Sequence, residues 1–202
     1  MKKLTLALLI SGSLVSSMAN ATVVNSLVNV DNTFNIYIST NDSTLGTLFS
    51  AGNSWPTTYA GSTSLSSGVT NYLHLVAVNQ GGPGGFLGEF TLSDANFAFA
   101  NGTQTLLTGD AGWKQNLTGF GNAYNPTVNE GVNGVGPWGT RGGYSVQPTW
   151  VWNYVSNGSS DYNTVYFSAA INAAGNDVPE PASMALLGLG LAGLSVMRRK
   201  AK

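Results

Sequence analysis

The 202-residue chain contains no cysteine, only one histidine and few charged residues, which make up 8% of the sequence. The absence of cysteine excludes disulfide bonds, cysteine metal ligands and a thiol nucleophile. The single histidine, His74, is the only side chain that could serve as the base of a serine-histidine-aspartate mechanism. Packing without crosslinks must therefore stabilise whatever part of the chain folds.

Basic residues are also scarce between the two ends of the chain. Residues 22–177 contain only Lys114 and Arg141 against eight acidic residues, a net charge of −6, whereas the whole chain has a net charge of −1. Proteins that bind nucleic acid present a basic patch to its phosphates. We therefore expect no nucleic-acid partner.

The first 21 residues have the layout of a secretory signal peptide. Lys2 and Lys3 precede an apolar segment at 4–15, and Ala19 and Ala21 form a small-x-small cleavage site around Asn20. We expect a signal helix, removal of residues 1–21 by signal peptidase, and export.

The last 25 residues combine three features in order. Val178-Pro179-Glu180-Pro181 precedes an apolar run at 182–197, and the cluster Arg198-Arg199-Lys200 follows. As a helix the run would be ~24 Å long, slightly short of the roughly 30 Å hydrocarbon core, although basic side chains can snorkel to the interface. Because basic residues stay on the cytoplasmic side, we expect a single transmembrane helix that anchors an exported precursor in the inner membrane.

This three-part ending resembles the PEP-CTERM sorting signal of Gram-negative bacteria. The resemblance implies that an exosortase cleaves at or near Pro179-Glu180-Pro181, so the membrane contact is transient and the protein passes to the cell surface or outside the cell. It also implies an association with exopolysaccharide and with biofilm or floc formation. An ordinary C-terminal membrane anchor is the alternative interpretation of residues 178–202.

The region between the two ends, residues 22–177, has the pattern of a single all-β domain. It is rich in Gly, Asn, Ser and Thr, and short alternating apolar runs are separated by turn residues. Residues 109–147 are rich in glycine and show no strand pattern, which is typical of a functional loop or of poor order. The pattern favours a jelly-roll β-sandwich of about eight strands. The expected strands lie at 32–39, 71–79, 86–92, 96–100, 104–107, 149–155 and 164–171.

A second resemblance covers roughly residues 28–92. The segments Val30–Ile38, Trp55-Pro56, Tyr72–Asn79 and Gly82–Leu87 follow in an order similar to that of the galactose-binding-like β-sandwich, an accessory module of many carbohydrate-active enzymes. Family members have an Asn-Gly turn after the first strand, whereas this chain has Ser39-Thr40-Asn41-Asp42. The resemblance implies a β-sandwich that binds carbohydrate.

Catalytic residues are hard to place in this sequence. His74 lies among apolar residues in an expected strand, where a locally hydrogen-bonded core histidine is more common than a general base. A surface glycan hydrolase would need two carboxylates across a cleft. Glu89 and Glu130 are the candidates, but nothing in the sequence brings them together, and we expect Glu89 on the solvent face of its strand. We therefore expect no enzyme activity and no catalytic cofactor.

A structural calcium ion is a further expectation that the sequence leaves open. Oxygen ligands suited to calcium occur in the expected loops, although none has EF-hand spacing and each can instead form a turn. These residues are Asp31, Asn32, Asp42, Asp94 and Asp110.

Aromatic residues in the expected loops suggest a carbohydrate site, because the C–H faces of sugars pack on aromatic rings. The candidates are Trp55, Trp113, Tyr124, Trp138 and Arg141. The alternative is that the loop tryptophans fill the ends of the sandwich. By contrast, Trp150, Trp152 and Tyr154 share one strand face and are expected in the core.

The sequence thus predicts an exported, non-enzymatic surface protein that acts in an exopolysaccharide matrix. Two functions remain open for the domain: a structural matrix component, or a lectin-like module that binds a polysaccharide.

Overall fold

The computed structural model describes residues 21–153 and 163–174. The expected signal helix, Tyr154, the expected membrane helix, the sorting motif and the basic cluster therefore lie outside the described residues. Within the described residues, no helix is long and apolar enough to cross a membrane.

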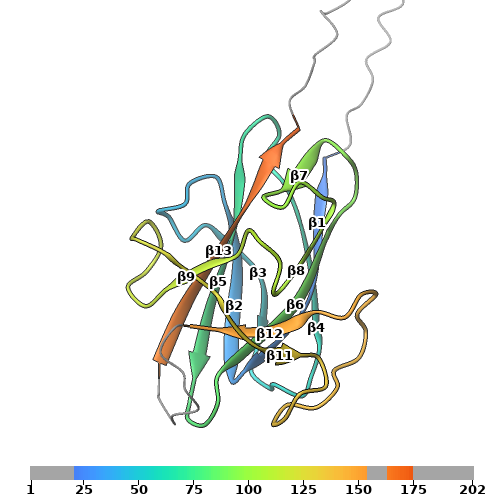
Figure 1. The fold of residues 1–202 in the computed structure, drawn as a ribbon. Coiled ribbons are helices and arrows are strands. Elements are labelled where there is room, and N and C mark those ends of the chain that lie inside the picture. Colours follow the sequence, from blue (N-terminus) through green and yellow to red (C-terminus); the bar gives the residue numbers. More distant parts are fainter. Residues whose placement is uncertain (1–20, 154–162, 175–202) are drawn as a thin grey trace, which may run out of the picture.

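The described residues form two antiparallel β-sheets that pack face to face (Figure 1). The first sheet has the strand order β11-β12-β6-β1-β4, and β8 also pairs with β6. Its strands are β1 (Val23–Asp31), β4 (Tyr59–Ser64), β6 (Gly85–Leu92), β8 (Thr105–Leu107), β11 (Val128–Val132) and β12 (Thr149–Trp152).

The second sheet has the order β10-β9-β13-β5-β2-β3, and β7 also pairs with β13. Its strands are β2 (Thr33–Ser39), β3 (Thr47–Gly52), β5 (Asn71–Asn79), β7 (Phe97–Phe99), β9 (Lys114–Asn116), β10 (Asn125–Pro126) and β13 (Asn163–Ala173). β5 lies between β2 and β13, with Leu73, Leu75 and Ala77 fully buried. The expected central strand at 71–79 is confirmed.

The main core fills the space between the two sheets. Alternate residues of each strand point inward, so Val24, Val28 and Val30 of β1 meet Ile36 of β2 and Phe167 of β13. The all-β sandwich expected from the alternating runs is thus confirmed, while the jelly-roll and galactose-binding-like type stays a prediction.

The turn before β6 is rich in glycine. Gly81 and Gly82 have φ values of 119° and 77°. Only glycine adopts these angles without strain, which allows the chain to reverse between β5 and β6.

The expectation for residues 109–147 was wrong in one respect, because three short strands, β9, β10 and β11, form there. β9 reads Lys-Gln-Asn and has no apolar alternation of its own. It forms because Tyr166, Phe167 and Ser168 of β13 offer a free edge that pairs with it. Strands β1, β3 and β4 were also not among the expected strands.

Both ends of the described domain meet at one turn, residues 93–96. The backbone amide of Ser93 donates to the carbonyl of Val23, and the amide of Ala174 donates to the carbonyl of Asn96, at 2.9 and 2.8 Å. The hydroxyl of Thr22 donates to Asp94 at 2.7 Å. The start of β1 and the end of β13 therefore leave the same end of the sandwich (Figure 1).

Candidate functional site

The five residues expected to bind carbohydrate do not gather at one place. Trp113 is 5% exposed and belongs to the main core, where its ring contacts Phe86 and Phe90 at centroid distances of 5.2 Å. It therefore fills the interior, as the alternative interpretation of the loop tryptophans held. Tyr124 lies beside the second sheet, near Lys114.

Trp55, Trp138 and Arg141 do lie together, on the outer face of the first sheet. Trp138 is 3% exposed and stacks on Trp150 with a centroid distance of 4.7 Å. Trp55 packs against this pair, and the Arg141 guanidinium lies 5.1 Å from the Trp55 ring. Trp150 and Trp152 are both fully buried, but Trp150 belongs to this outer cluster and Trp152 to the main core.

Residues 133–147, which we call the strap, cross this outer face. They are held by three polar residues that alternate with core residues and so point outward. Trp138 donates its indole N–H to Asp31 at 3.0 Å, and Tyr144 donates its hydroxyl to Asn29 at 2.6 Å. The third holding residue is Glu89, which accepts hydrogen bonds from Ser145. Burial raises the pKa of Asp31 although the Trp138 bond opposes it, and burial together with the Glu89 charge raises the pKa of Tyr144.

The expectation that Glu89 lies on a solvent-exposed face was wrong, because the strap covers it. The side chain is 4% exposed, and Ser145 donates its amide to Oε2 at 2.7 Å and its hydroxyl to Oε1. Glu130 lies in β11, and β12 separates that strand from β6. Glu89 is thus used to hold the strap, and the two carboxylates come from non-adjacent strands.

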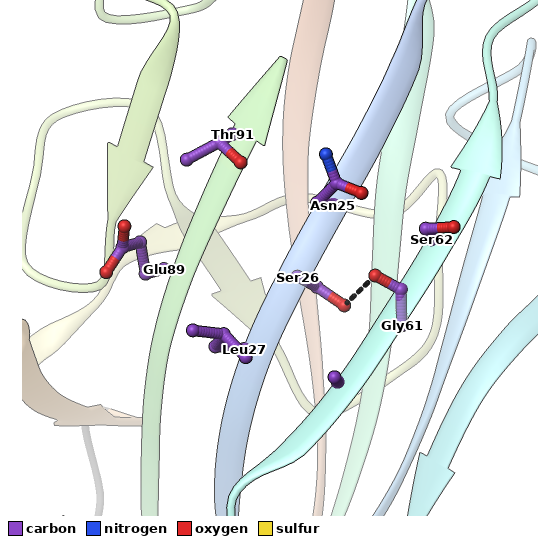
Figure 2. Close-up of a pocket in the computed structure, with 8 residues that line it drawn as sticks. Asn25, Ser26, Leu27, Gly61, Ser62, Glu89 and Thr91 are labelled. Atoms are coloured by element: carbon purple, nitrogen blue, oxygen red, sulfur yellow. Dashed lines mark hydrogen bonds between the residues drawn. The ribbon is translucent and has the colours of Figure 1, made fainter. Parts of the chain in front are cut away.

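Beside the strap, the outer face of the first sheet carries an open groove of about 460 Å³. Figure 2 shows its side chains rising from three neighbouring strands, β6, β1 and β4. The lining residues are Asn25, Ser26, Leu27, Ala60, Gly61, Ser62, Glu89 and Thr91. The groove combines small apolar surface with hydroxyl and amide groups, and Glu89 is its one charged lining residue.

The outer face of the second sheet carries a different polar cluster, centred on Asp42. One carboxylate oxygen accepts from Lys114 Nζ at 2.7 Å. The other accepts from Ser168 Oγ at 2.6 Å and Tyr124 OH at 3.3 Å, and lies 3.2 Å from His74 Nε2. Burial alone would raise the pKa of Asp42, but these hydrogen bonds and the charge of Lys114 outweigh it and lower the pKa.

His74 is fully buried in this cluster, on the side of β5 away from the main core. Phe120 covers its ring at a centroid distance of 3.9 Å, and Nδ1 lies 3.3 Å from the carbonyl oxygen of Leu45. Ser168 bonds to Asp42 and not to His74. The locally hydrogen-bonded histidine expected from the sequence is therefore observed, and the order of contacts differs from that of a serine-histidine-aspartate triad.

The residues considered for calcium are dispersed. Asp31 and Asp42 lie on opposite sheets, Asp94 accepts from Thr22 and Asn96, and Asp110 accepts from the amide of Leu107. Within residues 21–153 and 163–174, no three His, Asp or Glu side chains gather as a metal site. Calcium binding stays a prediction of the sequence.

Comparison with known families locates one further functional feature. Residues 177–200 match the PEP-CTERM protein-sorting motif. The match falls on the segment expected from the Pro-Glu-Pro, apolar and basic pattern, and it supports secretion and processing by an exosortase. Neither the curated proteins nor the solved structures give a significant match to the chain.

Sequence reasoning missed the groove and the Asp42 cluster. Lys114 and Ser168 are 72 and 126 positions from Asp42, and Ser145 is 56 positions from Glu89. No local pattern encodes these pairs, because the sheet topology creates them. The alternation of Asn25 and Leu27 with core residues was the one available signal for the groove, and it needed β1 to be recognised as a strand.

Proposed function

We propose that the protein is a non-enzymatic component of an extracellular polysaccharide matrix, released to the cell surface after an exosortase removes its C-terminal anchor. The observation that carries the proposal is the sorting motif at 177–200, which begins four positions after the end of β13. The association of such signals with exopolysaccharide supports the destination.

The arrangement of the chain ends supports this role. The turn at 93–96 binds both Val23 and Ala174, so the signal peptide and the sorting segment join the domain at one end. While the precursor is anchored, that end faces the membrane. The loops between β3 and β4 and between β5 and β6 then lie at the far end of the sandwich, where cleavage does not disturb them.

The non-enzymatic part of the proposal is supported by the way the reactive groups are bound. Glu89 is engaged by Ser145, and His74 is shielded by Phe120. Asp42 receives four donors in its cluster. A carboxylate that already accepts this many hydrogen bonds is held in its charged form and is a weak proton acceptor.

Cell fractionation tests the sorting proposal. A variant in which Pro179, Glu180 and Pro181 become alanine keeps the apolar run and the basic cluster. We expect it to accumulate in the membrane, while the wild-type protein reaches the surface or medium without residues 1–21 and without residues 182–197, as mass spectrometry would show. Equal release of the two proteins, or an intact 182–197 segment in released protein, would contradict exosortase processing.

Polysaccharide binding is the second candidate function for the same domain, and the groove on the first sheet favours it. A cavity of this size falls within the range of small-ligand sites. Pull-down of the exported protein with polysaccharide from the same cells would separate a binding module from a purely structural component. A structural component would remain in the unbound fraction.

A further inference from the structure

The groove beside the strap has polar side chains that the fold does not use. Within the described part of the chain, the side chains of Asn25, Ser62 and Thr91 make no hydrogen bond to other residues. This contrasts with the outward-facing Asn29 on the same strand, which bonds to Tyr144, Thr58 and the carbonyl of Trp55. The groove therefore offers uncommitted donors and acceptors.

The floor of the groove is apolar but contains no aromatic ring. Leu27 and Ala60 face each other across the β1–β4 pair, with Glu89 beside Leu27 on β6, and the free polar groups of Asn25, Ser62 and Thr91 form the next row across the same three strands. Antiparallel neighbours of this kind have Cβ atoms about 5 Å apart, so together they form a small aliphatic patch. A ligand that fits must present C–H groups to the Leu27–Ala60 row and hydroxyl or amide groups to the neighbouring polar row.

Charge narrows the ligand class further. Glu89 is the only charged residue that lines the groove. The described residues include two basic side chains, and neither lines the groove: Arg141 contacts Trp55 in the strap region, and Lys114 lies on the second sheet. An anionic ligand would meet a carboxylate without a basic counter-ion in the groove. The carboxylate keeps acceptor capacity beyond the bonds from Ser145 and Val146, because its two oxygens offer about four lone-pair sites.

We propose that this groove binds an uncharged, hydroxyl-rich glycan chain. The sugar C–H face lies on Leu27 and Ala60, and its hydroxyls bond to Asn25, Ser62 and Thr91. The site is on the sheet face, and Trp55, Trp138 and Arg141 hold the neighbouring strap. The proposal rests on the matrix role above, since a protein of the polysaccharide matrix would meet such a glycan chain.

Affinity electrophoresis of the full chain, expressed with its own signals and recovered after export, tests this site. Gels would contain either a neutral polysaccharide, such as a glucan, galactan or mannan, or an acidic one such as alginate. We expect at least one neutral polymer to retard the wild-type protein and the acidic polymer to have no effect. Retardation by the acidic polymer alone, or by none of the polymers, would overturn the proposal.

Two matched variants locate the binding. Ala60→Tyr places a bulky ring in the groove from an exposed position on the edge strand β4, and we expect it to weaken binding at least tenfold. Ala51→Tyr makes the same change at an exposed position on the edge strand β3 of the other sheet and should bind as the wild type does. Asn25→Ala with Thr91→Ala should weaken binding without filling the groove. Unchanged binding by Ala60→Tyr would contradict the site.

Folding and localisation keep this test separate from the matrix proposal. Each variant is compared with the wild type by circular dichroism and thermal unfolding before binding is measured. A protein that reaches the surface and loses its 182–197 segment but binds no neutral polymer would refute the groove proposal alone. Failure of release would instead refute the sorting proposal.

Discussion

Replacement of Asp42 is the sharpest test of how the outer face of the second sheet is held together. Its carboxylate joins the loop after β2 to β5, β9 and β13 through His74, Lys114 and Ser168. His74 and Ser168 are fully buried, whereas the Lys114 side chain is 37% exposed. Removal of the carboxylate should therefore cost more free energy at His74 and Ser168 than at Lys114.

The expected magnitude follows from this difference in burial. In Asp42→Ala, the buried donors of His74 and Ser168 lose their acceptor, and an unsatisfied buried polar group costs about 1–3 kcal/mol. Because the Asp42 side chain is itself 24% exposed, water can reach part of the site, so we expect a total loss of about 2–4 kcal/mol. Lys114→Met removes only a half-exposed ion pair, for which about 0–1 kcal/mol is usual. Asp42→Asn retains one acceptor oxygen and should fall between these values.

Urea unfolding, followed by tryptophan fluorescence at pH 7, measures these free energies. The pH dependence of the free energy of unfolding provides a second test. The pKa of Asp42 is lower in the folded protein than its ordinary value of 3.8, so its contribution is complete above that pH and is lost as the pH falls through the folded-state pKa. The stability advantage of the wild type over Asp42→Asn should therefore shrink below about pH 4.

A loss in Lys114→Met equal to that in Asp42→Ala would refute this reasoning, because it would place the energy in the exposed ion pair. An advantage over Asp42→Asn that stays constant from neutral pH to pH 3 would refute the assigned pKa shift.

Two further substitutions test the core and the strap. Trp113→Ala should lower the free energy of unfolding by about 3–5 kcal/mol, because it leaves a cavity in the main core, whereas the half-buried Trp55→Ala should cost less than half as much in the same urea titration. Glu89→Ala removes the acceptor of both Ser145 donors, so amide hydrogen exchange should quicken in residues 133–147 and stay unchanged in β5. Equal exchange in the two proteins would show that the strap is held without Glu89.

The strands that the sequence predicted are those with a strong local signal. Residues 71–79 alternate Leu73, Leu75 and Ala77 with other side chains, and the same period appears at 33–39 and 85–92. A residue that alternates into the core carries its own evidence of burial, so these strands could be recognised without knowledge of their neighbours.

Other strands exist because a neighbouring strand supplies hydrogen bonds. β4 reads Tyr-Ala-Gly-Ser-Thr-Ser, has no apolar alternation and is an edge strand paired only with β1. Gly61 is required there because a Cβ atom would lie 2.6 Å from Cβ of Ser50 on β3. The small residues that conceal β4 in the sequence are thus the ones that allow the two sheets to approach each other at this edge.

The same limit explains the result for the candidate site. The aromatic residues do make large contacts in the structure. The sequence could not, however, distinguish a tryptophan that would bind a ligand from one that packs against other residues of the domain. The structure assigns Trp113 to the core and Trp138 to the strap through Phe86 and Trp150. Residues with weak sequence signals, such as Asn25 and Thr91, remain uncommitted and line the groove.

Polar residues on the outer face of the first sheet have two roles: some hold the strap, and others line the groove. Asn29, Asp31 and Glu89 are buried under the strap, and each bonds to a residue of the strap. Because a buried polar group without a partner is costly, these residues fix where the strap must lie. Where the strap ends, Asn25 and Thr91 face water and carry no such cost. A ligand that replaces this water needs hydrogen-bonding groups of its own, which is the physical reason that a hydroxyl-rich chain suits this part of the face.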